Sequence, residues 1–364
     1  MDVADVNSNG GVLVDVQNNR FSKRTLTVAT GSTLDSEKID EQRFRLRKME
    51  TEHEEINRSR NVTRTCGQEA RHALLDRACA WMRDTNNMWT DRKRLLQDFT
   101  YKMLFVDDKR KVIYCEVPKV ACTSWKVLFA NLSGNVSEDE WPRIHNLVHA
   151  TSYYPKYGFK HLWQYSPAER EERLKNYYKF MVVRNPYSRI VSAWENKFKA
   201  HTGQSKWYHE NVGRYIIKKY RENPSNASLA TGSDVRFEEL VKFVGNPDET
   251  KQSRFDLHFW HQMSICSPCL IKYDYIAKLE TLQEDIDTIM EHITPGVKTQ
   301  LPFLNANKRG DASASEIEKI NSYFRNVTDI DLARLKQIYG LDTNAFGYSM
   351  VDNSYECDLN YHLN

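Results

Sequence analysis

The sequence has no hydrophobic run long enough to cross a membrane. A spanning helix needs about 18 or more consecutive apolar residues, and no stretch of the 364 residues approaches that length. The N-terminus also lacks the short apolar core of a secretory signal peptide. We therefore expect no transmembrane anchor within this chain.

The sequence also has little excess charge of either sign. It carries 52 Lys and Arg residues against 49 Asp and Glu residues, a net charge of +3. Nucleic-acid-binding proteins usually show a strong basic excess, so we expect no nucleic-acid partner. The balance still allows a local basic groove for an anionic polymer. With 40% hydrophobic residues, the chain has enough apolar side chains for a sizeable core.

A third absence concerns phosphate chemistry. The chain lacks the Gly-x-x-x-x-Gly-Lys loop of nucleoside triphosphatases and many kinases. This disfavours a phosphate-transferring enzyme.

Two segments nevertheless have the pattern of a short strand, a tight loop and a helix. Residues 112–114 are apolar and lead into residues 117–126; residues 180–183 are apolar and lead into residues 184–192. The start of a helix offers unpaired backbone N–H groups and a positive dipole end, which favour anions. Two such loops on one sheet predict a ligand with two separated phosphates.

These segments resemble a known family. Residues 118–126, Pro-Lys-Val-Ala-Cys-Thr-Ser-Trp-Lys, are similar to the 5′-phosphosulfate loop of Golgi carbohydrate sulfotransferases, and residues 184–198 resemble their 3′-phosphate segment. Residues 266–285 and 338–348 continue the resemblance in the order the family uses. It covers roughly residues 70–350 and points to the chondroitin 4-O-sulfotransferase and HNK-1 sulfotransferase group.

The resemblance implies a fold, a donor and an acceptor. The fold is α/β, a parallel sheet flanked by helices, of the P-loop nucleotide-kinase-like sulfotransferase type. The co-substrate is 3′-phosphoadenosine 5′-phosphosulfate, with no metal. The acceptor is a glycosaminoglycan or glycoprotein glycan, first of all O-4 of N-acetylgalactosamine in chondroitin or dermatan. Alternatives are another glycan, such as HNK-1-like glucuronic acid, or a non-catalytic glycan-binding relative. The oligomeric state stays open.

The resemblance also assigns donor-site residues. Charge develops on the leaving phosphate oxygen during transfer, and a fixed cation stabilises it. Lys119 is the candidate for this catalytic cation. The alternative is that it is a solvated surface charge, as a lysine in a loop ordinarily is. Thr123 and Ser124 either bind the 5′-phosphate or cap the helix, or do both, and Cys122 reads as a small packing residue. The donor-contacting set is Pro118, Lys119, Val120, Ala121, Cys122, Thr123, Ser124, Arg184, Asn185, Pro186, Tyr187, Ser188, Arg189, Ile190, Val191 and Ser192.

Within that set, Arg184 and Ser192 are assigned to the 3′-phosphate, and Pro186 is structural at the helix start. Arg189 contacts either ligand or only solvent, with nothing to choose between them. Ile190 and Val191 also read as the core face of their helix.

A general base must take the acceptor proton. His145 is the first candidate and His149 the second, because a neutral imidazole suits this task. Glu116, just before the first loop, is a rival. For both histidines the alternative is a surface or packing role.

The cysteines and sequons bear on the compartment. There are seven cysteines and six Asn-x-Ser/Thr sequons. Cys266 and Cys269 have the spacing of a zinc or redox pair, but no second pair at zinc-finger spacing follows. Structural disulfides suit an oxidising lumen better, and an odd number leaves at least one thiol unpaired within the chain. The resemblance places the protein in the Golgi lumen or membrane.

The remaining sequence predicts the organisation of the chain. Residues 1–68 read as a disordered or stem-like region, and residues 69–364 as the sulfotransferase domain. Residues 105–114 predict a hairpin, and Ser166 caps a helix that starts at Pro167. Further helices are expected at 70–82, 205–222, 237–243, 279–292 and 314–324. In the helix at 205–222, the basic residues Arg214, Lys218, Lys219 and Arg221 form either a solvated face or the lining of a glycan groove.

Overall fold

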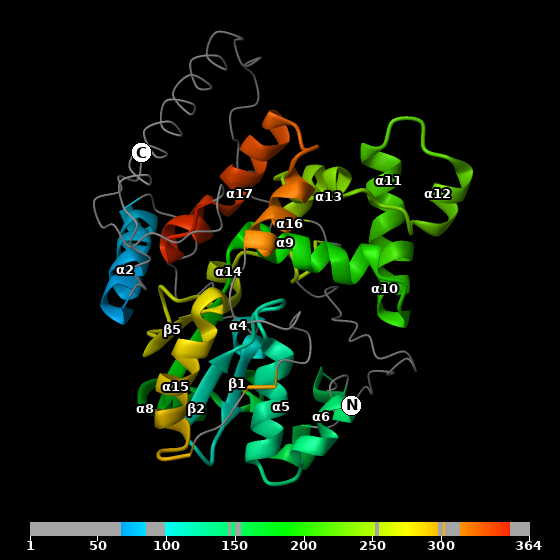
Figure 1. Cartoon of the computed structure of the whole chain (residues 1–364). Helices are drawn as coiled ribbons and strands as arrows, with labels where there is room; N and C mark the ends of the chain where they lie inside the picture. The colour runs from blue at the N-terminus through cyan, green and yellow to red at the C-terminus, as the bar shows by residue number, and fades with distance from the viewer. Residues whose placement is uncertain are drawn as a thin grey trace. The chain divides into compact units, whose positions relative to one another are not determined.

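The computed structural model describes residues 67–84, 99–144, 147–149, 154–251, 255–297, 301–302 and 314–349, which all belong to one compact unit (Figure 1). Nearly all of the region predicted as disordered or stem-like, residues 1–66, lies outside them. The domain boundary at residue 69 therefore stays a prediction.

A five-stranded sheet forms the centre, in the order β3-β1-β2-β4-β5. Strands β2, β4 and β5 run parallel, while β1 is antiparallel to both β2 and β3. The α/β class is confirmed, but the sheet is mixed. The predicted hairpin explains why: the turn between β1 and β2 is too short for a parallel crossover. The strands are β1 (Leu104–Asp107), β2 (Val112–Cys115), β3 (Lys160–His161), β4 (Tyr178–Val183) and β5 (Tyr275–Lys278).

Some helices lie beside this sheet, and others gather above it in the view of Figure 1. None of those described is long and apolar enough to span a bilayer. The α-helices are α2 (Gln68–Asp84), α4 (Phe99–Met103), α5 (Cys122–Leu132), α6 (Trp141–Ile144), α7 (Tyr154–Tyr157), α8 (Pro167–Asn176), α9 (Pro186–Trp194), α10 (Gly203–Tyr208), α11 (Arg214–Tyr220), α12 (Asn226–Thr231), α13 (Phe237–Val244), α14 (Gln262–Cys266), α15 (Leu282–Ile293), α16 (Ala314–Phe324) and α17 (Asp329–Phe346). Short 3₁₀ turns are η2 (Glu138–Glu140), η3 (Leu147–His149), η5 (Leu162–Gln164), η8 (Glu249–Lys251) and η9 (Leu279–Thr281), and π-helical turns are η6 (Glu195–Lys199) and η7 (His209–Gly213).

Most helix predictions are confirmed, one is corrected and one helix was missed. Ser166 caps α8 by accepting a hydrogen bond from the backbone N–H of Glu169, with Pro167 at the first position. The helix expected at 205–222 is instead α10 and α11, joined by the π-helical turn η7. Helix α17 was not anticipated as a helix.

Both faces of the sheet are covered. Tyr114 of β2 and Phe180 of β4 stack at 5.0 Å between ring centroids, and Trp125 of α5 lies 4.8 Å from Phe180. Tyr178 shares that face of β4, because side chains two residues apart point the same way; its ring stacks on α15. Cys115 alternates with Tyr114 and so faces the other side, where a disulfide joins it to α14.

Helix α2 precedes the first strand in the sequence but is fastened to β5 and α15, which come much later in the chain. The guanidinium of Arg71 donates to both carboxylate oxygens of Asp285, at 2.8 and 2.9 Å, and to the Ile276 carbonyl. The amide of Gln68 exchanges two hydrogen bonds with the backbone of Ile276, which covers the open edge of β5. A disulfide between Cys79 and Cys269 adds a covalent link.

The Arg71–Asp285 pair gives a stability prediction. Both side chains are 4% exposed, so Arg71→Ala leaves an uncompensated buried carboxylate. Loss of one partner of a buried pair typically costs about 3–5 kcal/mol. We expect a clear fall in the denaturant midpoint. Arg83→Ala, at an exposed position on the same helix, should leave it unchanged, and an equal effect of both changes would contradict the assignment.

Candidate active site

The loops that follow the three parallel strands meet at one edge of the sheet. They begin after Cys115, Val183 and Lys278, at the carboxyl ends of β2, β4 and β5. Ligands of open α/β sheets bind at this edge. The guanidinium of Arg184 donates from Nη1 to the carbonyl of Lys119 at 3.2 Å. The two loops singled out in the sequence are therefore in direct contact.

The loop after β2 has an uncommon backbone. Lys119 has φ 71° and Ala121 has φ 64°, both in the left-handed region. That region costs L-residues roughly 1–2 kcal/mol each, and such strain concentrates at ligand-binding sites. The turn leads directly into α5, whose first turn receives no side-chain cap. Backbone N–H groups in such a turn form a concave anion-binding surface.

The surroundings of Lys119 disfavour its charged form. Burial lowers the pKa of its ammonium to about 8, and the neighbouring positive charges of Lys197 and Arg184 act in the same direction. A bound anion would relieve both effects. A lysine crowded by other cations fits a site that receives a multiply charged phosphate.

The loop after β4 is built around a helix cap. The side-chain oxygen of Asn185 accepts hydrogen bonds from the backbone N–H groups of Tyr187 at 2.9 Å and Ser188 at 3.4 Å. Pro186 occupies the first helical position, as expected. Of residues 184–192, only Arg184 and Ser192 are partly exposed, and residues 185–191 are buried. The structure therefore separates the two side chains that can reach a ligand from those that hold the loop.

Arg189 does not face solvent, which was one of the two roles considered for it. Its side chain is fully buried, with 0% exposure. Nε donates to the Pro118 carbonyl at 2.9 Å, Nη1 to Trp260 at 2.7 Å and Nη2 to Leu257 at 2.9 Å. It fastens the loop after β2 to the segment 256–260.

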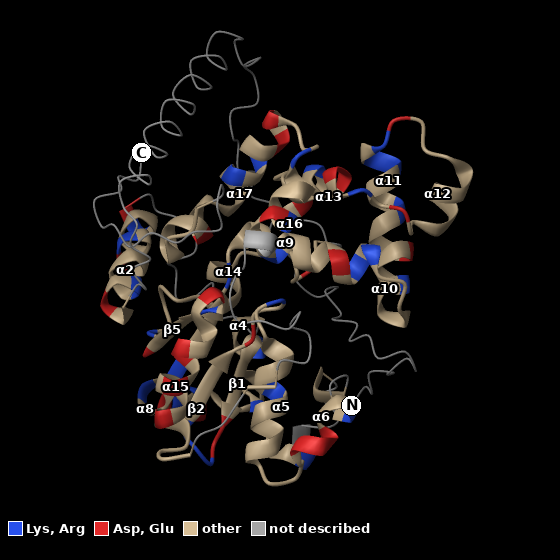
Figure 2. Cartoon of the chain, viewed as in Figure 1, with Lys and Arg blue, Asp and Glu red and all other residues tan. Residues whose placement is uncertain are grey.

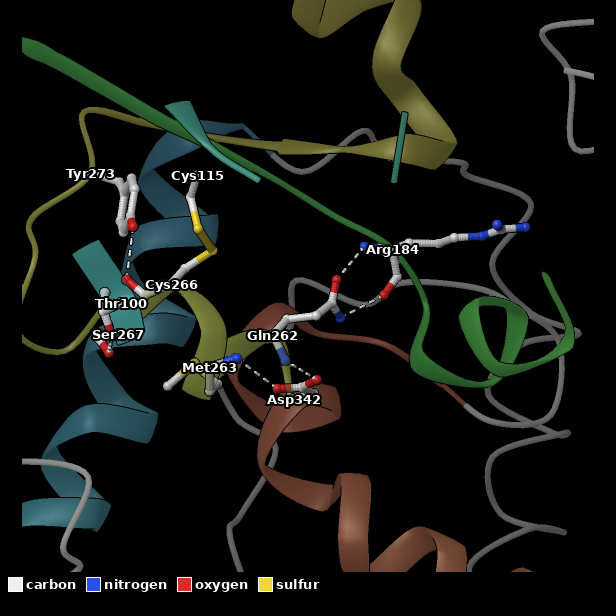
Figure 3. The surroundings of a disulfide bond; sticks show 9 residues. All are labelled: Thr100, Cys115, Arg184, Gln262, Met263, Cys266, Ser267, Tyr273 and Asp342. Carbon is white, nitrogen blue, oxygen red and sulfur yellow. Dashed lines mark hydrogen bonds between the residues drawn. A yellow bond between two sulfur atoms is a disulfide. The ribbon is translucent and has the colours of Figure 1, made fainter. Parts of the chain in front are cut away.

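Helix α14 positions the backbone of Arg184 (Figure 3). The Gln262 side chain accepts from the Arg184 N–H at 2.9 Å and donates to its carbonyl at 2.8 Å. Asp342 of α17 accepts from the N–H groups of Gln262 and Met263 at the start of α14.

The other end of α14 is covalently fixed. Cys266 is disulfide-bonded to Cys115, the last residue of β2, so α14 links the strand before one loop to the backbone of the other. Because Cys269 pairs with Cys79, the zinc and redox interpretations of Cys266 and Cys269 are wrong and the disulfide interpretation is confirmed. Cys122 is a free thiol.

The structure gives a different result for each of the three candidate general bases. His145 lies outside the described residues. The Nε2 of His149 is 2.9 Å from the Thr123 hydroxyl, so that ring contacts the first turn of α5. Burial alone would raise the pKa of Glu116, but the charges of Lys126 and His161 outweigh it and hold it at about 2. A carboxylate of that pKa is a poor general base near neutral pH.

Of the four basic residues in or just after α11, two are paired with carboxylates. Arg221 donates to Glu239 at 2.6 and 2.8 Å and to Asp234 at 2.6 Å, and Lys219 contacts Glu249. Arg214 and Lys218 are exposed. Figure 2 shows both signs of charge in this part of the chain, with basic segments on α10 and α11. The predicted cluster of four cations is thus reduced to two.

Four further residues that lie beside the site were not singled out from the sequence. They are Lys197, which lies on the π-helical turn η6, and Asp256, His258 and Gln262, in or next to the segment 256–260. Each is a common residue with no local motif, and only tertiary contacts bring them to the loops.

Comparison with known proteins shows the family of the chain. Residues 102–349 match the family described as "Sulfotransferase family". The chain is 35% identical over 266 residues to carbohydrate sulfotransferase 11 of Mus musculus, covering 73% of this chain and 72% of the relative. It is 32% identical to carbohydrate sulfotransferase 8 of Mus musculus, over 78% of this chain and 64% of the relative, and 31% identical to carbohydrate sulfotransferase 10 of Homo sapiens, over 70% and 69%.

No solved structure matches this chain. The family match spans both loops, α14 and all of α17, so the residues that build the site and those that hold it lie within the matched region. The chain belongs to the sulfotransferase family, as a carbohydrate O-sulfotransferase that uses 3′-phosphoadenosine 5′-phosphosulfate as its donor.

Proposed function

We propose that the donor lies across the two loops, with its 5′-phosphosulfate over residues 118–124 and its 3′-phosphate at Arg184 and Ser192. The observation that carries this is the contact between Arg184 and the Lys119 carbonyl, which puts two anion-binding loops side by side. The partly exposed guanidinium of Arg184 suits a phosphate, which it can bind through two parallel hydrogen bonds.

Lys119 then acts on the leaving group. As the bond from sulfur to the 5′-phosphate oxygen breaks, negative charge grows on that oxygen, and the Lys119 ammonium and the N–H groups of the first turn of α5 stabilise it. The uncapped start of α5 and the left-handed turn before it favour this role. The proposal needs no metal.

For the acceptor, we propose the 4-hydroxyl of N-acetylgalactosamine in chondroitin or dermatan. The family resemblance supports this choice, and the local surface suits an acidic polysaccharide. Trp207 of α10 is 44% exposed and offers a flat face to a sugar ring. Arg214 and Lys218 of α11 lie exposed on the same run of helices. A glucuronic-acid acceptor remains the second candidate, because the same cations attract its carboxylate.

We also propose that the enzyme works in the Golgi lumen. Two disulfides, Cys79–Cys269 and Cys115–Cys266, hold the domain together. Such bonds persist in the oxidising secretory pathway and are rare in the cytosol.

Replacing Lys119 by Ala should reduce turnover far more than donor affinity. Loss of one donor to a developing oxyanion raises the barrier by about 2.7–4 kcal/mol. In the wild type, the charge of Lys119 is present below its pKa of about 8 and disappears as the pH rises through that value, so kcat/KM should fall on that side. Radiolabelled sulfate transfer, followed across a range of pH, measures turnover and kcat/KM. Lys109→Ala, in the exposed turn at the other end of the sheet, is the control. Near-normal turnover of Lys119→Ala would remove Lys119 from the mechanism.

Replacing Arg184 by Ala should weaken donor binding, since the 3′-phosphate is remote from sulfur. Hydrogen bonds to charged groups are worth about 1.5–3 kcal/mol each. Calorimetry with adenosine 3′,5′-bisphosphate measures the loss, with the exposed Arg325→Ala as control. Unchanged affinity for the bisphosphate would rule out this placement of the 3′-phosphate.

The acceptor surface predicts a salt dependence. Attraction between exposed charges is screened over about 8 Å at physiological ionic strength, so the KM for chondroitin should rise with salt. The double change Arg214→Ala with Lys218→Ala should flatten that rise. The exposed pair Lys109 and Lys175, both replaced by Ala, should not.

Disaccharide analysis of the product identifies the acceptor position. The expected product carries sulfate at O-4 of N-acetylgalactosamine. Sulfate only on another sugar, or only at O-6, would refute the acceptor and leave the donor site standing.

A further inference from the structure

Another histidine, His258, lies in the segment 256–260, which Arg189 fastens to the loop that carries Lys119. Asp256 accepts a hydrogen bond from Nδ1 of His258 and another from its backbone N–H at 2.9 Å. The Tyr208 hydroxyl lies 3.2 Å from the same ring nitrogen. Burial alone would raise the pKa of Asp256, but His258 and Lys197 outweigh it and hold it at about 2. The ionised carboxylate keeps the proton on Nδ1 and leaves the lone pair of Nε2 for another group.

One guanidinium holds this histidine near the donor loop. Arg189 donates to the carbonyl of Pro118, the residue before Lys119, and to the carbonyl of Leu257, the residue before His258. The two side chains therefore come from backbone segments fastened to one buried group. The positive charge of Lys119 also lowers the pKa of the His258 ring, which agrees with this proximity.

The ring is also open on one side. The His258 side chain is 20% exposed, and Trp207, next to Tyr208, is exposed at the surface. The rings of Trp207 and Tyr208 are 5.1 Å apart between centroids, and those of Tyr208 and His258 are 5.9 Å apart. A sugar stacked on Trp207 would approach the histidine by way of Tyr208.

We propose that His258 is the general base of the transfer and that Asp256 orients it. This rests on the proposed donor placement, which puts sulfur near Lys119. The acceptor hydroxyl gives its proton to Nε2 of His258 while its oxygen forms a bond to sulfur. The bond from sulfur to the 5′-phosphate oxygen breaks, and that oxygen keeps the electron pair. The products are the sulfated sugar, adenosine 3′,5′-bisphosphate and a proton on His258, which passes to solvent.

The surroundings of the ring favour its neutral form. Burial lowers the pKa of His258 below its usual 6.5; Asp256 opposes this, and Lys197 and Lys119 reinforce it. The groups that face the ring are thus one carboxylate, two ammonium groups and the Tyr208 hydroxyl. As the pH falls through that lowered pKa, the ring is protonated and the base is lost. Once the ring has taken the proton, Asp256 stabilises the imidazolium.

The test compares His258→Gln with the wild type, using labelled donor and desulfated chondroitin. General bases contribute about 10²–10⁴-fold to rate, so kcat should fall by that range while affinity for adenosine 3′,5′-bisphosphate stays within about twofold. The acid limb of the kcat/KM profile should disappear. His292→Gln is the matched control, an exposed histidine that stacks on Tyr178 at the start of β4, away from the loops.

A second variant keeps the proposal testable if His258→Gln fails to fold. Asp256→Asn removes the charge that raises the His258 pKa, so its acid limb should move to lower pH and kcat should fall. If the acid limb of Asp256→Asn does not move, or if His258→Gln keeps a near-normal kcat, His258 is not the general base. Either result would leave the proposed donor site standing. Loss of bisphosphate affinity in step with thermal stability would show a structural role and also overturn it. A wild type that neither binds the bisphosphate nor transfers sulfate would overturn both proposals.

Discussion

The buried guanidinium of Arg189 is the interaction on which the site depends. Taking a charge out of water is costly, and here three backbone carbonyls compensate for it, at Pro118, Leu257 and Trp260. The same contacts tie α9, the loop after β2 and the segment 256–260 into one unit. A shorter or uncharged side chain at 189 would release all three segments at once.

Helix α14 adds a second constraint on the loops. Its first residue, Gln262, brackets the backbone of Arg184, and its last, Cys266, is bonded to Cys115. Asp342 caps its start, so α17 supports the site by holding α14 in place. These buried contacts preorganise the pair of loops, as precise transfer chemistry requires.

Local patterns in the sequence predicted those parts of the fold that local physics determines. Ser166 followed by Pro167 and Glu169 carries its own cap, and the strand-loop-helix pattern around Lys119 needs only neighbouring residues. The antiparallel strand β1 followed from its tight hairpin, although the sheet was expected to be parallel. By contrast, Arg189 and His258 are ordinary residues in sequence. The partners of Arg189 lie 71 and 68 residues away, and Tyr208 lies 50 residues from His258, and no periodicity encodes such contacts. The pairing of Cys266 with Cys115 depends on the folded chain in the same way.

Hydrogen–deuterium exchange of the wild-type enzyme, with and without adenosine 3′,5′-bisphosphate, tests the central claim most directly. If the two loops form one donor site fastened by Arg189, the ligand should slow amide exchange in residues 119–125 and 184–192 together, and in 256–262 through the shared guanidinium. Protection confined to one loop, or to a region away from the carboxyl edge of the sheet, would contradict the account.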